Sequence, residues 1–279
     1  MRMAVIIRRL TKFASRQRAV WPAAALSASL ASQAAFCAQD TETNGNLLKY
    51  EKPRFLTARI YAKGSDRKNL LFNFTRQSTR SGETLQVLRE YKYPDGKPAA
   101  RERLVYAGDN LVSYELEELQ TGGRGRADIR CAPGHGDKGR ICFEYSSDAA
   151  SGAKPKTDSE SLQKDTLIND MVGPFLMSHW DALVNGREVK CRYIVVPRRE
   201  TVGFCFRKES ETTCEGRSVV IIKMQATSPV IAALIDPLFF TIEKNEPNRV
   251  LEYVGGTTPK IKSGGKWKDV DVVTVFDWK

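Results

Sequence analysis

The sequence predicts an α+β fold: a curved, mostly antiparallel sheet, or half-barrel, with two helical insertions covering its concave face. Three observations support this prediction. Short segments of alternating polarity, separated by turns, fill most of the chain after residue 50. Two apolar stretches, 161–185 and 228–238, interrupt them. Beyond a leader, about 240 residues are left, enough for one domain with its own core.

Residues 1–38 are typical of a signal peptide. They contain no Asp or Glu, and their six basic residues all lie between Arg2 and Arg18. The apolar run that follows, 19–31, is too short for a membrane span, which needs about 20 predominantly apolar residues. This compact run favours bacterial export over a mitochondrial presequence. We therefore expect a periplasmic or secreted protein without a stable transmembrane anchor.

The end of the leader offers several cleavage sites. Cleavage after Ala31, Ala34 or Ala38 fits the small residues there. Cys37 permits a lipoprotein interpretation, but Phe36 occupies the preceding position, where a small residue is expected. Simple secretion is therefore favoured. A polar linker, 39–50, leads into a single domain, 51–279.

Removing the leader also changes the charge. The whole chain has 44 Lys and Arg against 33 Asp and Glu. Without the six basic residues of the leader, 38 cationic residues face the same 33 acids, a net charge of +5. These charges are interspersed, whereas nucleic-acid binding needs a clustered basic face, so we expect no nucleic-acid partner. A mildly cationic surface suits an anionic lipid or cell-wall polymer.

Half-buried strands are predicted in the first part of the domain, where polar and apolar residues alternate. They are expected at 55–62, 70–76, 84–93, 101–106, 111–119, 128–131 and 140–145. Residues 93–97 (YPDGK) form a turn, because Pro fixes φ and Gly tolerates positive φ. Residues 146–160 are poor in apolar side chains and predict an exposed connection.

The second part mixes helices and strands. Residues 161–184 place apolar side chains at helical spacings, and Gly173-Pro174 is expected to divide that helix. A short helix, 229–235, begins with Ser228 as its cap and Pro at its first position. Further strands are expected at 187–196, 201–207, 217–224, 239–243, 249–254 and 270–276. Consecutive hairpins predict antiparallel pairing, and a long sheet of this kind curls.

Five cysteines lie beyond the leader and are disulfide candidates in an oxidising compartment: Cys131, Cys142, Cys191, Cys205 and Cys214. The first two can close a loop, and Cys205 can pair with either of its neighbours. The sequence does not choose between these pairings. One thiol is left unpaired if Cys37 is removed. No metal site is expected, because no Cys-x-x-Cys occurs and only His135 lies near the first pair.

No catalytic constellation is recognised in the sequence. His179 beside Asp181 would be a general base, but no positioned nucleophile accompanies it, which favours an ordinary helix histidine. Glu115 and Glu117 would be a glycosidase pair, but they share one face of a strand, most simply a solvated face. We therefore expect a non-enzymatic protein that needs no cofactor, with a hydrolase as the least favoured alternative.

An apolar ligand site is predicted where the insertions face the sheet. Residues 228–242 are almost wholly apolar, so they are either enclosed core or the border of an apolar site. The residues expected to line it are Met171, Phe175, Leu176, Trp180, Ile231, Leu234, Ile235 and Phe239. Arg198 and Arg199, in a turn, are candidates for phosphate or carboxylate contacts at the rim, or are solvated turn charges.

The order of elements resembles the LolA/LolB/RseB-like group of periplasmic proteins. The segments YKYPDGK (91–97), RERLVY (101–106) and LVSYEL (111–116) are also similar to uncharacterised exported proteins with this plan. The resemblance covers most of 50–279. It implies a half-barrel closed by helices around a hydrophobic cavity that binds a lipid or lipoprotein acyl chain without catalysis. The alternative is a structural or protein-interaction module of the cell envelope with a filled core.

Overall fold

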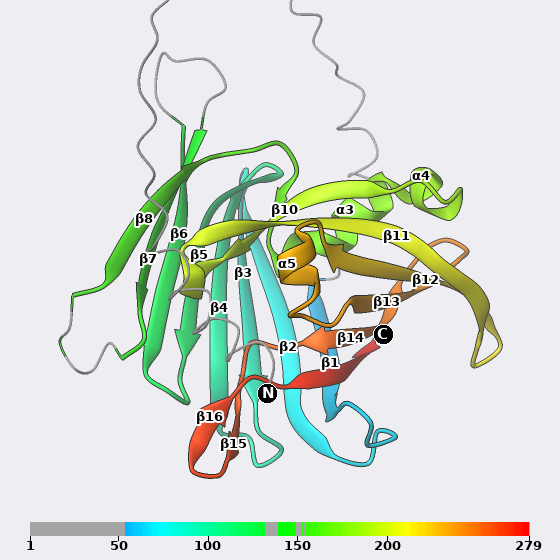
Figure 1. Cartoon of the computed structure of the whole chain (residues 1–279), viewed down its shortest axis with the longest axis horizontal. Helices are drawn as coiled ribbons and strands as arrows, with labels where there is room; N and C mark the ends of the chain where they lie inside the picture. Colours follow the sequence, from blue (N-terminus) through cyan, green and yellow to red (C-terminus); the bar gives the residue numbers. More distant parts are fainter. Residues whose placement is uncertain (1–53, 132–138, 149–151, 153, 279) are drawn as a thin grey trace, which may run out of the picture.

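The structure, a computed structural model, describes residues 54–131, 139–148, 152 and 154–278. The predicted signal peptide and linker, and with them Cys37, lie outside the described residues, as does His135. The structure is 61% strand and 10% helix (Figure 1). The prediction of an α+β fold with helices covering the concave face is therefore wrong, and the protein is mostly β.

One sheet of fifteen strands forms the body of the protein, in the order β8-β7-β6-β5-β4-β3-β2-β1-β17-β14-β13-β12-β11-β10-β9. Neighbouring strands are antiparallel except β9 and β10, which are parallel. The first eight strands are β1 (Phe55–Ala62), β2 (Leu70–Ser81), β3 (Thr84–Lys92), β4 (Pro98–Ala107), β5 (Asn110–Glu118), β6 (Gly123–Cys131), β7 (Gly139–Ser146) and β8 (Lys156–Ser161). They form a simple meander, which confirms the predicted antiparallel pairing.

The rest of the sheet carries the helices. Its strands are β9 (Thr166–Leu167), β10 (Val189–Val195), β11 (Glu200–Cys214), β12 (Arg217–Ala226), β13 (Leu238–Glu243), β14 (Val250–Gly256) and β17 (Asp271–Asp277). The helical turns are η2 (Asn169–Met171), α3 (Val172–Ser178), α4 (Trp180–Val184), η3 (Val196–Arg198) and α5 (Pro229–Ala232). A separate hairpin consists of β15 (Ile261–Ser263) and β16 (Lys266–Lys268).

The sheet curls until its two ends meet through side chains. Glu160 lies on β8, the first strand of the order, and Thr201 lies near the other end, on β11. The Thr201 backbone N–H donates to both Glu160 carboxylate oxygens at 3.1 Å, and the Thr201 hydroxyl donates to one of them at 2.7 Å. Arg192 Nε in turn donates to the Thr201 hydroxyl at 2.8 Å. The sheet is thus barrel-like, but it is not closed by a backbone ladder.

The helical insertions are shorter than predicted, and α3 is the longest helix in the described part of the chain, at seven residues. Gly173 and Pro174 lie in the first turn of α3, where a missing N–H leaves no helical hydrogen bond unmade. They therefore begin the helix instead of dividing it. Leu167 precedes it in β9, and the second insertion contains only the single turn α5.

Two strand predictions also need correction. Residues 156–160, predicted as part of an exposed connection, and Ser161, predicted to begin the helical insertion, form β8. At this sheet edge most side chains face water, so no apolar alternation is needed. Strand β11 continues through 208–214, beyond the end of the predicted strand 201–207. Its outer segment is exposed, so polar composition there does not prevent strand pairing with β12.

Three clusters of buried side chains fill the curl. The largest lies between α3, α4 and strands β10 to β14 (Figure 1), and includes Leu176, Phe206 and Ile222, all 0% exposed. A second joins β3 to β7 with Ile168, and a third lies between β1, β2 and β17. No helix in the described part of the chain has the length and hydropathy to span a membrane.

Candidate functional site

The residues predicted to line a ligand site fall into three groups. Phe175 and Leu176 are buried members of the largest cluster. Four others are partly buried and pack against it: Met171, Trp180, Ile231 and Ile235. Leu234 is half-buried outside that cluster, and Phe239 faces away from its buried neighbour Phe240, with Lys223 Nζ 6.0 Å from its ring centroid. The structure thus brings six of the eight predicted residues together.

The predicted rim arginines lie at the turn between β10 and β11. Arg198 donates to Glu200 through Nε, so its charge is already paired. Arg199 has a left-handed backbone (φ 58°), and its buried Nε has no hydrogen-bond partner among the described residues. The same turn carries Val196, which packs against the second cluster beside Gly125 of β6. These residues therefore lie where the two ends of the sheet meet.

None of the candidate disulfides forms among the described residues, where Cys142, Cys191, Cys205 and Cys214 are free thiols. Cys205 and Cys214 are nine residues apart on one strand, β11, and so about 30 Å apart. Cys191 lies opposite Phe204 and Cys205 opposite Lys190, which places the two thiols on opposite faces. Burial raises the pKa of the Cys191 thiol to about 12, so it is unreactive.

The pairing of Cys131 with Cys142 is excluded by register. Cys142 lies opposite Asp128, three residues along β6 from Cys131, whose own partner is Gly139. Three strand residues span about 10 Å, beyond the roughly 7 Å limit for Cα atoms joined by a disulfide.

The residues weighed for catalysis do not assemble into a constellation. His179 Nδ1 contacts the Ser178 hydroxyl at 2.9 Å and the Phe175 carbonyl oxygen at 3.0 Å, within its own helical segment. Among the described residues, no hydrogen bond or ion pair joins its side chain to Asp181. Glu115 and Glu117 lie on β5 and form ion pairs with arginines on neighbouring strands.

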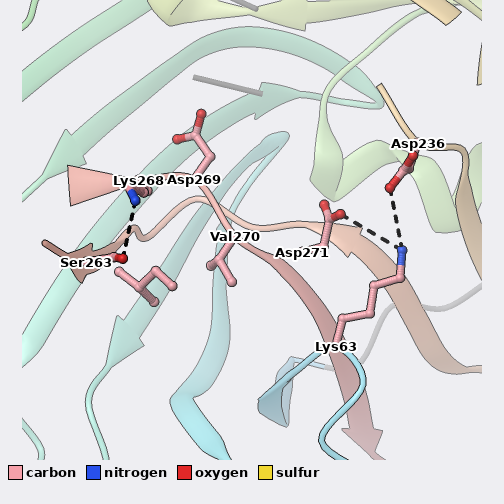
Figure 2. A pocket seen from close by; sticks show the side chains of 8 residues that line it. Lys63, Asp236, Ser263, Lys268, Asp269, Val270 and Asp271 are labelled. Carbon is pink, nitrogen blue, oxygen red and sulfur yellow. Dashed lines mark hydrogen bonds and ion pairs between the residues drawn. The ribbon is translucent and has the colours of Figure 1, made fainter. Parts of the chain in front are cut away.

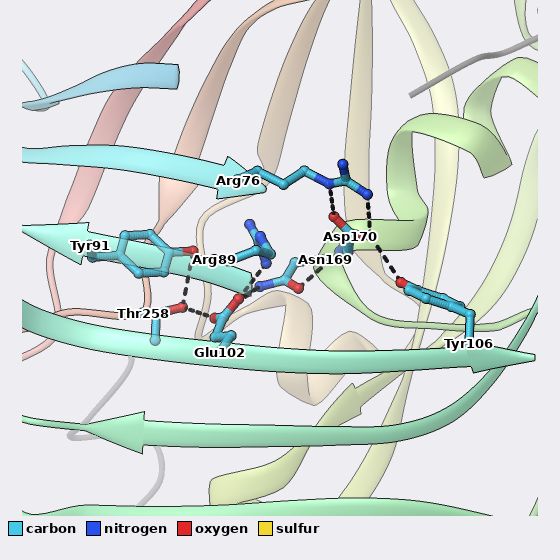
Figure 3. Close-up of polar contacts among 8 residues, drawn as sticks. All are labelled: Arg76, Arg89, Tyr91, Glu102, Tyr106, Asn169, Asp170 and Thr258. Carbon is cyan, nitrogen blue, oxygen red and sulfur yellow. Dashed lines mark hydrogen bonds and ion pairs between the residues drawn. The ribbon is translucent and has the colours of Figure 1, made fainter. Parts of the chain in front are cut away.

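A row of charged residues crosses the inner face of the sheet where only apolar residues were expected. Arg76 on β2 lies directly opposite Arg89 on β3, and Arg89 lies opposite Glu102 on β4. Arg76 shares the inner face of β2 with Phe72 and Phe74, because side chains two residues apart point to the same side of a strand. Arg76 is 4% exposed and Glu102 is 0% exposed. Arg76 and Glu102 are therefore buried inside the curl, and Arg89 between them is 12% exposed. Figure 3 shows the three side chains on neighbouring strands.

The helical insertion holds one end of this row. Arg76 Nε donates to Asp170 Oδ1 at 2.7 Å, and Arg76 Nη2 donates to Asp170 Oδ2 at 3.3 Å. The Tyr106 hydroxyl on β4 donates to Asp170 Oδ2 at 3.0 Å (Figure 3). Asp170 belongs to η2, so the ion pair attaches the start of the insertion to the inner face of the sheet.

Glu102 is the centre of the second contact. It accepts a hydrogen bond from Arg89 Nη1, and Asn169 Nδ2 lies 3.1 Å from both of its oxygens. Thr258 Oγ1, in the segment after β14, donates to Glu102 Oε1 at 2.6 Å (Figure 3). Burial lowers the pKa of Arg89, but the surrounding Glu102, Tyr91, Asp170 and Tyr114 together outweigh burial, and the net pKa is raised. The guanidinium group therefore stays charged inside the protein.

Partly buried tyrosines pack against the apolar cluster next to this charged row. The ring of Tyr193 lies 6.0 Å from that of Phe204, and the ring of Tyr253 lies 5.1 Å from that of Phe240. The pKa of the Tyr193 hydroxyl is raised well above its usual value, first by burial and then by Tyr253 and Glu102, while Arg89 opposes the shift. Apolar and charged surfaces therefore meet at these rings.

Sequence reasoning missed the charged row, although a signal was present. Arg76, Arg89 and Glu102 each occupy the apolar side of an alternating strand. One charge on an inward position is ambiguous, but three on successive predicted strands indicate charges that pair across the sheet. Their partners Asn169, Asp170 and Thr258 come from distant segments, so only the folded chain identifies them.

Two open clefts lie away from the predicted lining. The larger, about 530 Å³, is polar and is bordered by Lys63, Asp236, Asp269 and Asp271 (Figure 2). Lys63 Nζ lies 3.9 Å from a carboxylate oxygen of both Asp236 and Asp271, so these surface charges offset one another. A smaller cleft of about 220 Å³ lies beside Trp278. None of the eight predicted lining residues borders either cleft.

No protein-family model and no curated protein sequence matches the chain. A β-barrel-like protein of a domain of unknown function (DUF1849) from Brucella abortus resembles it with 7% identity and a TM-score of 0.38, over 80% of this chain and 96% of that chain. A DUF1329 family protein from Desulfovibrio piger has 10% identity and a TM-score of 0.22, over 84% and 87%. A porin-like protein from Bacteroides uniformis has 7% identity and a TM-score of 0.21, over 80% and 96%.

These similarities are too low to carry an argument about function. The first of these structures is described as β-barrel-like, and none of the three is a LolA, LolB or RseB protein. The curled antiparallel sheet therefore stands on the strand pairing of this chain alone.

Proposed function

We propose that this chain is an exported, non-enzymatic binding protein that holds a lipid or acyl chain between the helical insertion and the inner face of the curled sheet. The observation that carries the proposal is the largest buried cluster, which extends from α3 and α4 across β10 to β14. Its surface is apolar, as acyl chains require. Burying one methylene of such a chain contributes about 0.8 kcal/mol to the free energy of binding.

The edge of this cluster supports an entry route for the ligand. α3 and α4 are short and have no buried polar cap, and Met171, Trp180 and Ile231 are only partly buried against the cluster. A short segment held mainly by apolar contacts opens at lower free energy than a strand inside a ladder. A chain that enters beneath α3 would replace some of these contacts with its own methylenes.

The proposal is tested by lipid extraction. The mature protein is purified from the periplasm without detergent, and its organic extract is analysed by mass spectrometry. A lipid at about one molecule per protein is the expected result. Gentle purification that yields a folded protein and no lipid would contradict the proposal.

A matched pair of variants on α5 locates the ligand. Ile231→Glu places a charge against the apolar cluster, and Val230→Glu places one on the adjacent side chain, which is 63% exposed. We expect the first variant to lose its lipid while keeping a native circular dichroism spectrum, and the second to retain it. Equal lipid content in both variants would place the ligand elsewhere.

A second candidate function is a cell-envelope module that binds a protein partner. The observation that favours it is the full burial of Leu176 and Leu183, because a filled interior needs no ligand. This alternative predicts an empty lipid extract together with one polypeptide that co-purifies at a fixed ratio.

A further inference from the structure

Arg89 has hydrogen-bonding capacity that the rest of the protein does not use. Its side chain is 12% exposed, and Cζ lies 5.1 Å from the ring centroid of Phe74. Among the described residues, its one hydrogen bond runs from Nη1 to Glu102, so Nε and Nη2 have no partner there. A guanidinium group has five N–H donors. Neither free nitrogen is among the fully buried unpartnered atoms of the described residues, so each is open to a small molecule.

Two guanidinium groups lie side by side in the sheet, and each has an acid beside it. Arg76 lies directly opposite Arg89 in the sheet, and like charges at such positions repel each other. Asp170 lies against Arg76, whereas Arg89 shares Glu102 with Asn169 and Thr258. An acceptor beside Arg89 would therefore pair nitrogens that the shared carboxylate of Glu102 leaves free.

Two tyrosine hydroxyls near Arg89 are also available. Tyr91, Tyr106 and Tyr253 each take part in a hydrogen bond. Within the described part of the chain, the hydroxyls of Tyr114 and Tyr193 make none. Burial raises the pKa of both, and the charges of Glu102 and Arg89 act on each. Both hydroxyls are therefore protonated donors close to the charged row.

The position of these donors suits an amphipathic molecule. Tyr193 packs against the apolar cluster with its ring 6.0 Å from that of Phe204, and Tyr114 on β5 lies opposite Leu104, two residues from Glu102 on β4. A ligand whose chain follows the cluster would bring its head group to the tyrosines and then to the guanidinium group. A carboxylate or a phosphate accepts two parallel hydrogen bonds from arginine, which makes either group a good fit.

We propose that Arg89, with the hydroxyls of Tyr114 and Tyr193, binds the anionic head group of the ligand, a carboxylate or a phosphate. This inference rests on the proposed function and names the head-group chemistry of the same site. Neutral lipids of equal chain length bind more weakly, because they leave the guanidinium donors unpaired.

The test compares three twelve-carbon ligands by isothermal titration calorimetry on the exported protein after lipid removal. Dodecanoate carries a carboxylate, dodecyl phosphate carries a phosphate, and dodecan-1-ol is neutral. We expect one or both anions to bind at least about tenfold more tightly than the alcohol, since hydrogen bonds to charged groups exceed neutral ones by that order. The anion that binds more tightly shows whether the preferred head group is a carboxylate or a phosphate.

Two conservative variants test the residues. Arg89→Lys keeps a positive charge beside Glu102 but removes the fork of nitrogens, and the double variant Tyr114→Phe/Tyr193→Phe removes only the hydroxyls. Each is expected to reduce the preference for the anion several-fold while leaving the affinity for dodecan-1-ol unchanged. Arg101→Lys, on β4 at an ion-paired position with Glu90 and Glu117, is the matched control and should keep the full preference.

The outcomes separate the two proposals. If the alcohol binds as tightly as both anions, the head-group inference is overturned, and water is the partner of Arg89. The proposal of acyl-chain binding then still stands. If none of the three ligands binds to a folded protein, the proposed function itself fails. If the variants lose affinity for all three ligands equally, these residues support the fold and do not select the head group.

Discussion

The two regions of the curled sheet have the same antiparallel backbone and different interiors. Behind β2 to β4, the inner face carries the row Arg76, Arg89 and Glu102. Behind β10 to β13, it carries fully buried Phe206 and Ile222. Backbone pairing therefore does not dictate what a sheet encloses. The side chains at inward positions decide it, and here they place a charged surface beside an apolar one.

The charged interior is tolerated because each acid has more than one donor. Glu102 accepts from three side chains and Asp170 from two. Buried ion pairs stabilise less than apolar residues of similar volume, so their presence calls for a second role. We infer that the charged row is retained for ligand selection and for attaching η2. The predictions below test whether the charged interior and the apolar interior differ in this way.

The largest effect is expected from Glu102→Ala in the charged region. It leaves Arg89 buried without an acid and should cost about 3–5 kcal/mol of unfolding free energy, measured by urea denaturation. Glu115→Ala, which removes a 42% exposed side chain paired with Arg126 at 3.7 Å, is the matched control and should cost about 0–1 kcal/mol.

A double variant sharpens this result. Arg89→Met/Glu102→Leu makes the charged region resemble the apolar one, and we expect it to recover most of the stability that Glu102→Ala loses. A double variant as unstable as the single one would mean that the charges themselves support the fold, and the distinction between the two interiors would be structural only.

An intermediate effect is expected where the two regions join. A Cβ atom at Gly125 of β6 would collide with Val196 of η3 and lie 2.8 Å from Tyr145 Cδ2. Gly125→Ala should therefore cost about 1–3 kcal/mol through overpacking, again by urea denaturation. Adding Val196→Ala makes room for the new methyl group, so the double variant should lose less than the sum of the two single changes. Strict additivity would contradict this contact.

The smallest effect is expected at Asp269, which borders the larger polar cleft. Burial raises the pKa of its carboxyl; Lys260 opposes the shift and Glu118 adds to it. The folded state therefore binds the proton more tightly than the unfolded state does. This contribution to stability is complete below the unfolded pKa and is lost as pH rises through the folded pKa.

Asn does not titrate, so Asp269→Asn removes the loss of stability that Asp269 causes as the pH rises. The variant should melt slightly above the wild type at pH 7, and the difference in Tm should shrink as the pH is lowered toward 3. A difference in Tm that stays constant over this range would show that titration of Asp269 does not contribute.

The prediction of the candidate site succeeded where the buried face follows from the sequence pattern of a single segment. The apolar periodicity of 161–184 placed Phe175, Leu176 and Trp180 on one cluster, because a helical repeat specifies a face. It failed for Phe239, where strand alternation turns the side chain outward and its neighbour Phe240 inward. It also missed Glu102, whose role depends on Asn169 and Thr258 far along the chain.

The sequence by itself determined the strands and their antiparallel order, since alternation and turn residues act over a few positions: 55–62 was predicted as a strand and forms β1. It did not determine the amount of helix, the existence of β8 or the extension of β11, because weak local preferences yield to strand pairing. Only the tertiary structure decided that Glu160 meets Thr201, that Arg76 meets Asp170, and that the cysteines lie too far apart or on opposite faces. Such contacts depend on how the whole sheet curls, which is set by the sum of its strand twists and not by any one segment.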